Sequence, residues 1–333
     1  MLLSRTEEHV LGERMRRREF IALIGIWPLA ARAERIARVG YLGLTSADSV
    51  QASRIEAFRG GLRRLGYVEG KNIEIEFRFA QGNSDRLPSL AAELINLHVD
   101  VLVTYATGVL AAHHMTTTTP IVMATFGDAV ATGVVASLAK PGGNVTGSTF
   151  FSPELTAKRL ELLKEVIPSL HRAGVLLIRD NEINSPSIEL MGERAKALGV
   201  ELEVFEARGP VDFDDAFARW SNGKIGAVVV GDHAFLVANS NVIAALAATH
   251  RLPSAGPLEL AATGGLIAYG VDFPEMFRRA AVFVDKILRG ANPGDIPVEQ
   301  TTRIQMIVNS RTAKTIGIEL PISLLLRADE VID

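Results

Sequence analysis

The sequence of 333 residues contains no cysteine, and aromatic residues make up only 6% of it. Without cysteine, no disulfide can hold the fold together, although exported proteins often use disulfides. Hydrophobic residues make up 48% of the chain, which is enough for a substantial core. The protein must therefore be stabilised by the packing of its apolar core, and its length allows two domains of ordinary size.

An excess of positive charge is also lacking. The net charge is −3, and residues 1–33 hold six arginines and four acids, so the rest of the chain keeps 29 basic and 34 acidic residues. No basic patch is clustered in the sequence, which argues against nucleic acid as a partner. After Ala33, no apolar run reaches the roughly 20 residues that a membrane-spanning helix needs.

Motifs of catalysis are missing as well. The sequence contains no H-E-x-x-H, no G-x-S-x-G, no Walker loop, and no G-x-G-x-x-G after the first expected strand. His113 and His114 are adjacent, so their rings cannot share one helix face to hold a metal ion. We therefore expect neither an enzyme nor a protein with a metal or another cofactor.

What the sequence does contain begins with an export-like segment at residues 15–34, MRRREFIALIGIWPLAARAE. Three arginines precede ten uncharged, mostly apolar residues, and Ala31 and Ala33 provide the small-x-small pattern of a cleavage site before Glu34. The basic part also resembles a twin-arginine export motif. Ten residues are too few to cross a bilayer. The alternative is a basic N-terminus followed by one short buried helix.

From Ile36 onward, short β-rich runs alternate with amphipathic helical stretches. This rhythm predicts parallel sheets with helices on both faces, in two α/β lobes without a long linker. The expected strands are residues 36–43, 72–79, 99–104, 120–124, 173–180, 200–207, 225–232, 252–255, 265–269 and 302–309, with another after Pro141. The expected helices are residues 53–65, 87–97, 108–115, 152–166, 185–198, 212–220, 235–250 and 273–288.

The loops after these strands predict a binding site, because ligands of open parallel sheets lie beyond the carboxyl ends of the strands. The loops hold hydroxyl, carboxylate, amide and aromatic groups, which suit a small zwitterion with an apolar or aromatic side chain. An alternative for Asp128, Asp180 and Asp232 is that each only caps the next helix. The candidate ligand-binding residues are Thr45, Ser46, Tyr105, Thr107, Phe126, Asp128, Asp180, Asn181, Asp232 and Glu259.

Several blocks resemble the substrate-binding proteins of ABC transporters that carry a tryptophan/tyrosine-type label. They are RLPSLAAELINLHVDVLVT, SLAKPGGNVTG, ELTAKRLELLKEVIP, RRAAVFVDKILRGANPGDIPVEQTTRIQMIVN and LPISLLLRADEVID. The resemblance implies a type I periplasmic binding fold: two Rossmann-like lobes joined by a three-crossover hinge. Mapped onto this chain, residues 34–149 and 272–298 form lobe one, and residues 150–271 and 303–333 form lobe two.

The resemblance also implies a function. We expect an exported, periplasmic solute-binding protein, monomeric, that captures an amino acid or a related small carboxylate or amine between its lobes. It would deliver this ligand to a membrane ABC permease. Two alternatives stay open at this point: a periplasmic sensor on the same fold that signals to a membrane partner, and, with thinner support, a periplasmic enzyme that uses Asp128 or Asp232 as a base.

Overall fold

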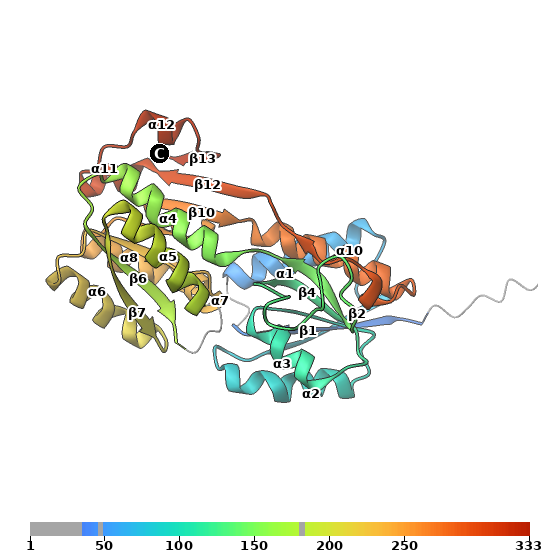
Figure 1. Ribbon diagram of the computed structural model, residues 1–333. Helices are drawn as coiled ribbons and strands as arrows, with labels where there is room; N and C mark the ends of the chain where they lie inside the picture. The colour runs from blue at the N-terminus through green and yellow to red at the C-terminus, as the bar shows by residue number, and fades with distance from the viewer. Residues whose placement is uncertain (1–34, 46–48, 180–183) are drawn as a thin grey trace, which may run out of the picture. The chain divides into compact units, whose positions relative to one another are not determined.

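Two mainly parallel β-sheets, with helices packed on both faces of each, form the core of the protein (Figure 1). The structure is a computed structural model that describes residues 35–45, 49–179 and 184–333. The predicted export segment lies outside the described residues. Over the described ranges, no helix is long and apolar enough to span a membrane.

The first sheet has the strand order β11-β5-β4-β3-β1-β2, and every pair in it is parallel. Four helices cover it: α1 (Ser49–Arg64), α2 (Leu87–Asn96), α3 (Thr107–Met115) and α10 (Phe273–Leu288). The strands are β1 (Ala37–Gly43), β2 (Ile73–Phe79), β3 (Val101–Tyr105), β4 (Ile121–Phe126), β5 (Val145–Thr149) and β11 (Glu299–Gln300).

Alternating side chains of these strands divide the core of the first sheet into two layers. Val39 and Tyr41 pack with α1 and α10 on one face, whereas Leu42 packs with α2 and α3 on the other. Helices α1 and α10 approach closely, because a Cβ on Gly61 would lie 2.6 Å from the Arg278 carbonyl oxygen. Strands that are apolar on both faces are typical of a buried parallel sheet.

The second sheet has the order β13-β12-β10-β9-β8-β6-β7, and only its β10–β12 pair is antiparallel among the pairs described. Its strands are β6 (Arg172–Ile178), β7 (Glu201–Ala207), β8 (Ala227–Val230), β9 (Ser254–Gly256), β10 (Ile267–Val271), β12 (Ile304–Asn309) and β13 (Glu330–Ile332). Its helices are α4 (Ser152–Val166), α5 (Asn184–Leu198), α6 (Phe213–Asn222), α7 (Ala234–Ala238), α8 (Ser240–Thr249), α9 (Leu258–Ala262), α11 (Ser310–Ile316) and α12 (Ile322–Leu325). Within the described residues there are also three 3₁₀ turns, at Ser84–Arg86, Pro210–Asp212 and Pro293–Asp295.

The chain passes between the two sheets three times. It does so between β5 and α4, between β10 and α10, and between β11 and β12. Helix α10 therefore packs against α1 beside the first sheet, although it directly follows a strand of the second. The predicted α/β fold with two mainly parallel sheets is confirmed. The predicted lobe boundaries stay a prediction.

The prediction of one continuous helix over residues 235–250 is wrong. The structure contains α7 and α8 there, separated at Asn239. The Asn239 side-chain amide donates to the Phe235 carbonyl oxygen at 2.7 Å, and Ser240 Oγ donates to the Val237 carbonyl oxygen at 2.8 Å. Short polar side chains that bind nearby backbone carbonyls compete with helical hydrogen bonds, which explains the break.

Candidate ligand-binding site

A cavity of about 130 Å³ lies at the carboxyl ends of strands from both sheets. The first sheet contributes the ends of β3 and β4 and the start of α3, and the second contributes the segment from the end of β8 into α7. The lining residues are Arg54, Tyr105, Ala106, Thr107, Leu110, Thr125, Phe126, Gly127, Thr132, Phe150, Asp232, His233, Ala234, Val237 and Phe273.

Aromatic rings form much of the cavity wall. Tyr105 and Phe126 come from the first sheet, whereas Phe150 and Phe273 lie at two of the crossings between sheets. The rings of Phe150 and Phe273 meet edge to face at 5.6 Å between centroids. Together with Leu110 and the apolar residues of α7, they suit the body of an apolar or aromatic ligand.

Two hydroxyl groups on the first-sheet side have no hydrogen-bond partner in the described part of the chain. They are the buried Oγ1 atoms of Thr107 and Thr125, and both residues line the cavity. Thr107 opens α3, and no side chain caps the first turn of that helix. A helix N-terminus attracts anions, because its backbone N–H groups and its dipole face them. This end of the cavity is therefore suited to a carboxylate.

The chain must bend sharply to place α3 there. Ala106 has φ +49° and ψ −135°, a backbone conformation that L-residues rarely adopt. Two residues later, a Cβ on Gly108 would lie 2.3 Å from Thr104 Oγ1, so only glycine fits. The sharp turn at Ala106 and the close approach at Gly108 together place the start of α3 against the end of β3.

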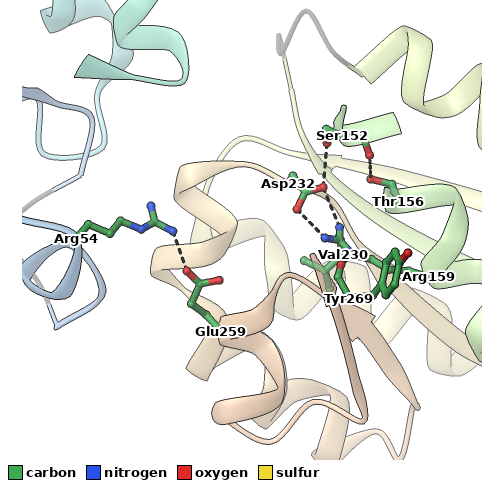
Figure 2. A network of polar contacts seen from close by, with 8 residues as sticks. All are labelled: Arg54, Ser152, Thr156, Arg159, Val230, Asp232, Glu259 and Tyr269. Atoms are coloured by element: carbon green, nitrogen blue, oxygen red, sulfur yellow. Dashed lines mark hydrogen bonds and ion pairs between the residues drawn. The ribbon is translucent and has the colours of Figure 1, made fainter. Parts of the chain in front are cut away.

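Arg54 of α1 lines the cavity and binds Glu259, which belongs to the second sheet's helices, as the dashed line in Figure 2 shows. Its Nη2 lies 2.8 Å from Oε1 of Glu259 in α9, and its guanidinium carbon lies 4.6 Å from the ring centroid of Phe273. The Arg54 side chain is only 4% exposed. Arg54 Nε and Glu259 Oε2 are buried without partners among the residues described, so this ion pair uses one oxygen only.

Asp232 lies in a second network, which is complete (Figure 2). Arg159 of α4 binds both carboxylate oxygens of Asp232 at 2.7 and 3.1 Å, and Ser152 Oγ donates to Oδ2 at 2.9 Å. Arg159 also donates to the Tyr269 and Val230 carbonyl oxygens. Both charged side chains are almost fully buried, at 0% and 2% exposure. The Asp232 carboxylate is therefore already satisfied, and it is poorly placed to take a ligand ammonium group.

His233 follows Asp232 and lies on the same wall of the cavity. Its Nδ1 accepts a hydrogen bond from the Phe235 backbone N–H at 3.2 Å and so caps α7. Burial lowers the pKa of His233 to about 4, because a charged imidazole would lose its hydration there. The side chain is therefore neutral at pH 7.

The sequence from residue 39 to residue 332 matches the profile of the family described as ABC transporter substrate binding protein. The chain belongs to this family. The family is non-catalytic, which confirms the prediction that the protein is not an enzyme. Over the described residues, no group of three or more His, Asp or Glu side chains could hold a metal ion.

Individual relatives agree with this assignment. A tyrosine-binding protein of Clostridioides difficile (strain R20291) is 28% identical over 285 residues, which cover 84% of this chain and 81% of that protein. The solved structure of an ABC domain in complex with L-Trp from Streptococcus pneumonia has a TM-score of 0.82 at 22% identity, covering 89% and 99% of the two chains. A conserved domain protein from Vibrio cholerae has a TM-score of 0.83 at 26% identity, covering 89% and 100%.

The structure brings together part of the predicted site of this substrate-binding protein. Tyr105, Thr107, Phe126 and Asp232 line the cavity. Behind them, Thr45 Oγ1 lies 3.4 Å from the Tyr105 hydroxyl, so Thr45 supports the wall rather than forming it. Ligand contact by these residues stays a prediction.

The other predicted residues of the substrate-binding protein lie away from the cavity or outside the described residues. Glu259 reaches it only through Arg54. Asp128 Oδ1 accepts hydrogen bonds from the backbone N–H groups of Val130 and Ala131 within a turn, so it caps no helix. Ser46, Asp180 and Asn181 are not among the described residues.

Sequence reasoning missed four polar residues of the cavity wall, which are Arg54, Thr125, Thr132 and His233. Arg54 was hidden because it lies within an amphipathic helix, where an arginine usually faces solvent. Thr125 lies inside an apolar strand, and His233 directly follows a better candidate, Asp232. The position of His233 after a strand was a usable signal, since the strand-end rule that selected Asp232 applies equally to the next residue.

Proposed function

We propose that this substrate-binding protein is exported, captures an amino acid with an aromatic side chain between two lobes, and delivers it to a membrane ABC permease. The observation that carries the proposal is the cavity itself. It combines aromatic walls with buried, unpartnered hydroxyl groups at the start of α3, and residues of both sheets line it. Membership of the family supports the extracytoplasmic location and the permease partner.

The carboxylate of the amino acid would bind at the start of α3. Thr107 and Thr125 would donate their hydroxyl hydrogens to it, and the helix dipole would add a favourable field. Arg54 contributes positive charge nearby, although Glu259 neutralises part of it. Binding a carboxylate would also remove the cost of leaving two buried hydroxyls unpaired.

The side chain of the amino acid would lie among the aromatic rings. One water needs about 10–15 Å³, so a cavity of about 130 Å³ takes a molecule on the order of ten non-hydrogen atoms. Phenylalanine, tyrosine and tryptophan are of this size. A relative described as tyrosine-binding and a similar fold solved with L-Trp support the same class.

Closure of the lobes would trap the ligand. Residues of both sheets line the cavity, so a ligand can contact all of them only when the sheets are close together. Such a ligand binds the closed form more tightly and shifts the population towards it. The three crossings near Thr149, Val271 and Gln300 would bend as the hinge.

Isothermal titration calorimetry on the full chain tests this proposal. We expect L-tyrosine, L-phenylalanine or L-tryptophan to bind, and Thr125→Val to weaken that binding about ten- to hundredfold, since a hydrogen bond to a charged group contributes about 1.5–3 kcal/mol. The same variant should be as stable as the wild type or more so, because it removes an unpaired buried hydroxyl.

Thr146→Val is the matched control. Thr146 is also a buried threonine beside the first sheet, but its Oγ1 donates to the Ile296 carbonyl oxygen at 2.8 Å, and it does not line the cavity. This variant should lose stability and keep ligand affinity. Absence of binding by all three amino acids, or wild-type affinity in Thr125→Val, would contradict the proposal.

A further inference from the structure

We propose that His233 sets ligand specificity by donating a hydrogen bond from Nε2–H to an oxygen of the ligand other than its carboxylate, so that the site prefers hydroxylated aromatic acids. The inference rests on the proposed function, because it concerns the same cavity. It adds a specificity-determining residue that neither the family assignment nor the relatives provide, and it gives a physical reason for a preference in line with the tyrosine-binding relative.

The hydrogen-bonding pattern fixes which nitrogen of His233 carries the hydrogen. Nδ1 accepts the Phe235 N–H, so it cannot itself be protonated while α7 is capped in this way. A neutral imidazole then carries its hydrogen on Nε2. The lowered pKa of His233 agrees with the neutral form at pH 7. His233 is thus a donor at Nε2.

No described residue takes this hydrogen. The nearest acid in the chain, Asp232, uses both carboxylate oxygens to bind Arg159 and Ser152. The imidazole lies on the wall of the main cavity and also borders a small cavity of about 10 Å³, which is the size of one water. An unpartnered donor on the wall of a ligand cavity is satisfied when the ligand brings an acceptor.

Contacts with elements of the first sheet fix the start of α7, directly after His233, beside the cavity. Ala234 packs against the apolar clusters of the first sheet, and Phe235 lies so close to Gly82 that a Cβ there would be 3.0 Å from its ring. Gly82 has φ +82°, in the loop after β2. The start of α7 is therefore held in place, and the hydrogen bond to Nδ1 fixes the orientation of the His233 imidazole.

The polar atoms around the cavity are then mainly donors. The buried ones without partners are the hydroxyls of Thr107 and Thr125 and Nε of Arg54. Nε2 of His233 joins them as a donor on the cavity wall. The hydroxyls lie on the first-sheet side, whereas His233 comes from the second sheet. A ligand that satisfies both sides has a carboxylate at one end and a further oxygen elsewhere on an aromatic body, as a phenol does.

Calorimetry with two ligand pairs on the full chain tests the inference. The pairs are L-tyrosine against L-phenylalanine, and 4-hydroxyphenylacetate against phenylacetate. We expect the wild type to bind the hydroxylated member at least about tenfold more tightly in at least one pair, because a donor that the ligand cuts off from water without offering an acceptor is costly. His233→Asn should reduce that preference to about twofold or less, because asparagine can still cap α7 but cannot reach as far.

Two further measurements separate specificity from structure. His171→Asn changes an exposed histidine outside the cavity, so it should keep the preference. NMR of imidazole nitrogens should show hydrogen on Nε2 of His233 and a shifted Nε2–H signal when the hydroxylated ligand binds. Hydrogen on Nδ1 would overturn the inference even if His233→Asn were unstable.

The outcomes distinguish the two proposals. If both members of each pair bind equally to the wild type, the role of His233 is wrong and the aromatic-acid site stands. If none of the four compounds binds, the proposed function fails, and the inference fails with it. A preference that His233→Asn leaves intact overturns the inference alone.

Discussion

The two sides of the cavity satisfy their polar groups in different ways. On the first-sheet side, Thr107 and Thr125 have buried hydroxyls without partners. On the second-sheet side, Asp232 is bound by Arg159 and Ser152. The difference teaches that polar residues at strand ends can serve two purposes. Those on the first-sheet side keep hydroxyl groups open for binding, whereas those on the second-sheet side bind one another and fix the shape of the cavity wall.

The complete network has a physical reason. Burying a carboxylate and a guanidinium costs several kcal/mol each, and their attraction offsets this only when further hydrogen bonds satisfy the remaining atoms. Arg159 obtains these from the carbonyl oxygens of Tyr269 and Val230. It thereby joins α4, β8 and β10 at the edge of the sheet that faces the cavity.

Breaking the Arg159 network should have the largest effect. We expect Arg159→Met to lower the free energy of unfolding by about 3–5 kcal/mol, because Asp232 is left buried without its counter-charge. Urea denaturation measures this loss. Arg289→Met is the control. Arg289 is exposed, so its ion pair with Asp285 should contribute less than about 1 kcal/mol. Similar losses in the two variants would contradict the assigned role of Arg159.

Acid should lower the free energy of unfolding through His233, which lies on the second-sheet side of the cavity. Its pKa is about 4 in the folded protein against 6.5 as the ordinary value, so between these pH values the unfolded chain binds a proton that the folded chain does not. Stability should therefore fall as the pH falls from 6.5 towards 4, by on the order of 3 kcal/mol in total.

Urea denaturation at pH 7 and pH 4.5 measures this slope. His233→Asn should be less sensitive to pH than the wild type. Burial and His114 also lower the pKa of His113, and the comparison of the two proteins subtracts that contribution. An equal slope in both proteins would show that His233 is not buried as a neutral group.

Breaking the ion pair between Arg54 and Glu259, which links the two sides, should lower ligand affinity more than it lowers the free energy of unfolding. We expect Glu259→Gln to reduce binding of an aromatic amino acid about fivefold, because a partly buried ion pair that joins the sheets is lost with little change of shape. Calorimetry measures this loss. Glu165→Gln, which breaks an ion pair with Arg327 among elements of the second sheet, should leave affinity unchanged. Equal affinity in Glu259→Gln and wild type would exclude a role in closure.

Relieving the backbone strain at Ala106, on the first-sheet side, should have the smallest effect. It should raise the free energy of unfolding rather than lower it. Ala106→Gly should raise the free energy of unfolding by about 1 kcal/mol, because glycine adopts φ +49° freely. Ala111→Gly, in the interior of α3, should lower it by about 1 kcal/mol instead. Thermal unfolding measures both. A loss of stability in both variants would mean that Ala106 is not strained.

Much of the fold could be predicted from the sequence, because apolar runs and helical periodicity are local signals. The strand ends near Tyr105, Thr107 and Phe126 followed directly from them, although these residues end β3, begin α3 and end β4 rather than lying in loops. The pairing of charges could not be predicted, since Arg159 and Asp232 are far apart in the chain and meet only through the strand order. The division of residues 235–250 into two helices depended on two side-chain hydrogen bonds, which an apolar pattern does not reveal.

The three crossings between the sheets also bear on how the protein folds. The core of the first sheet contains α10, which packs against α1 although most of the second sheet's sequence lies between them. The second sheet similarly receives β12 only after the chain has returned from the first. Contacts between such distant segments close large loops, and they slow folding. Neither sheet can complete its core without segments from late in the sequence. A chain that is still being synthesised would therefore expose apolar surface on both sheets until residues beyond β11 are available.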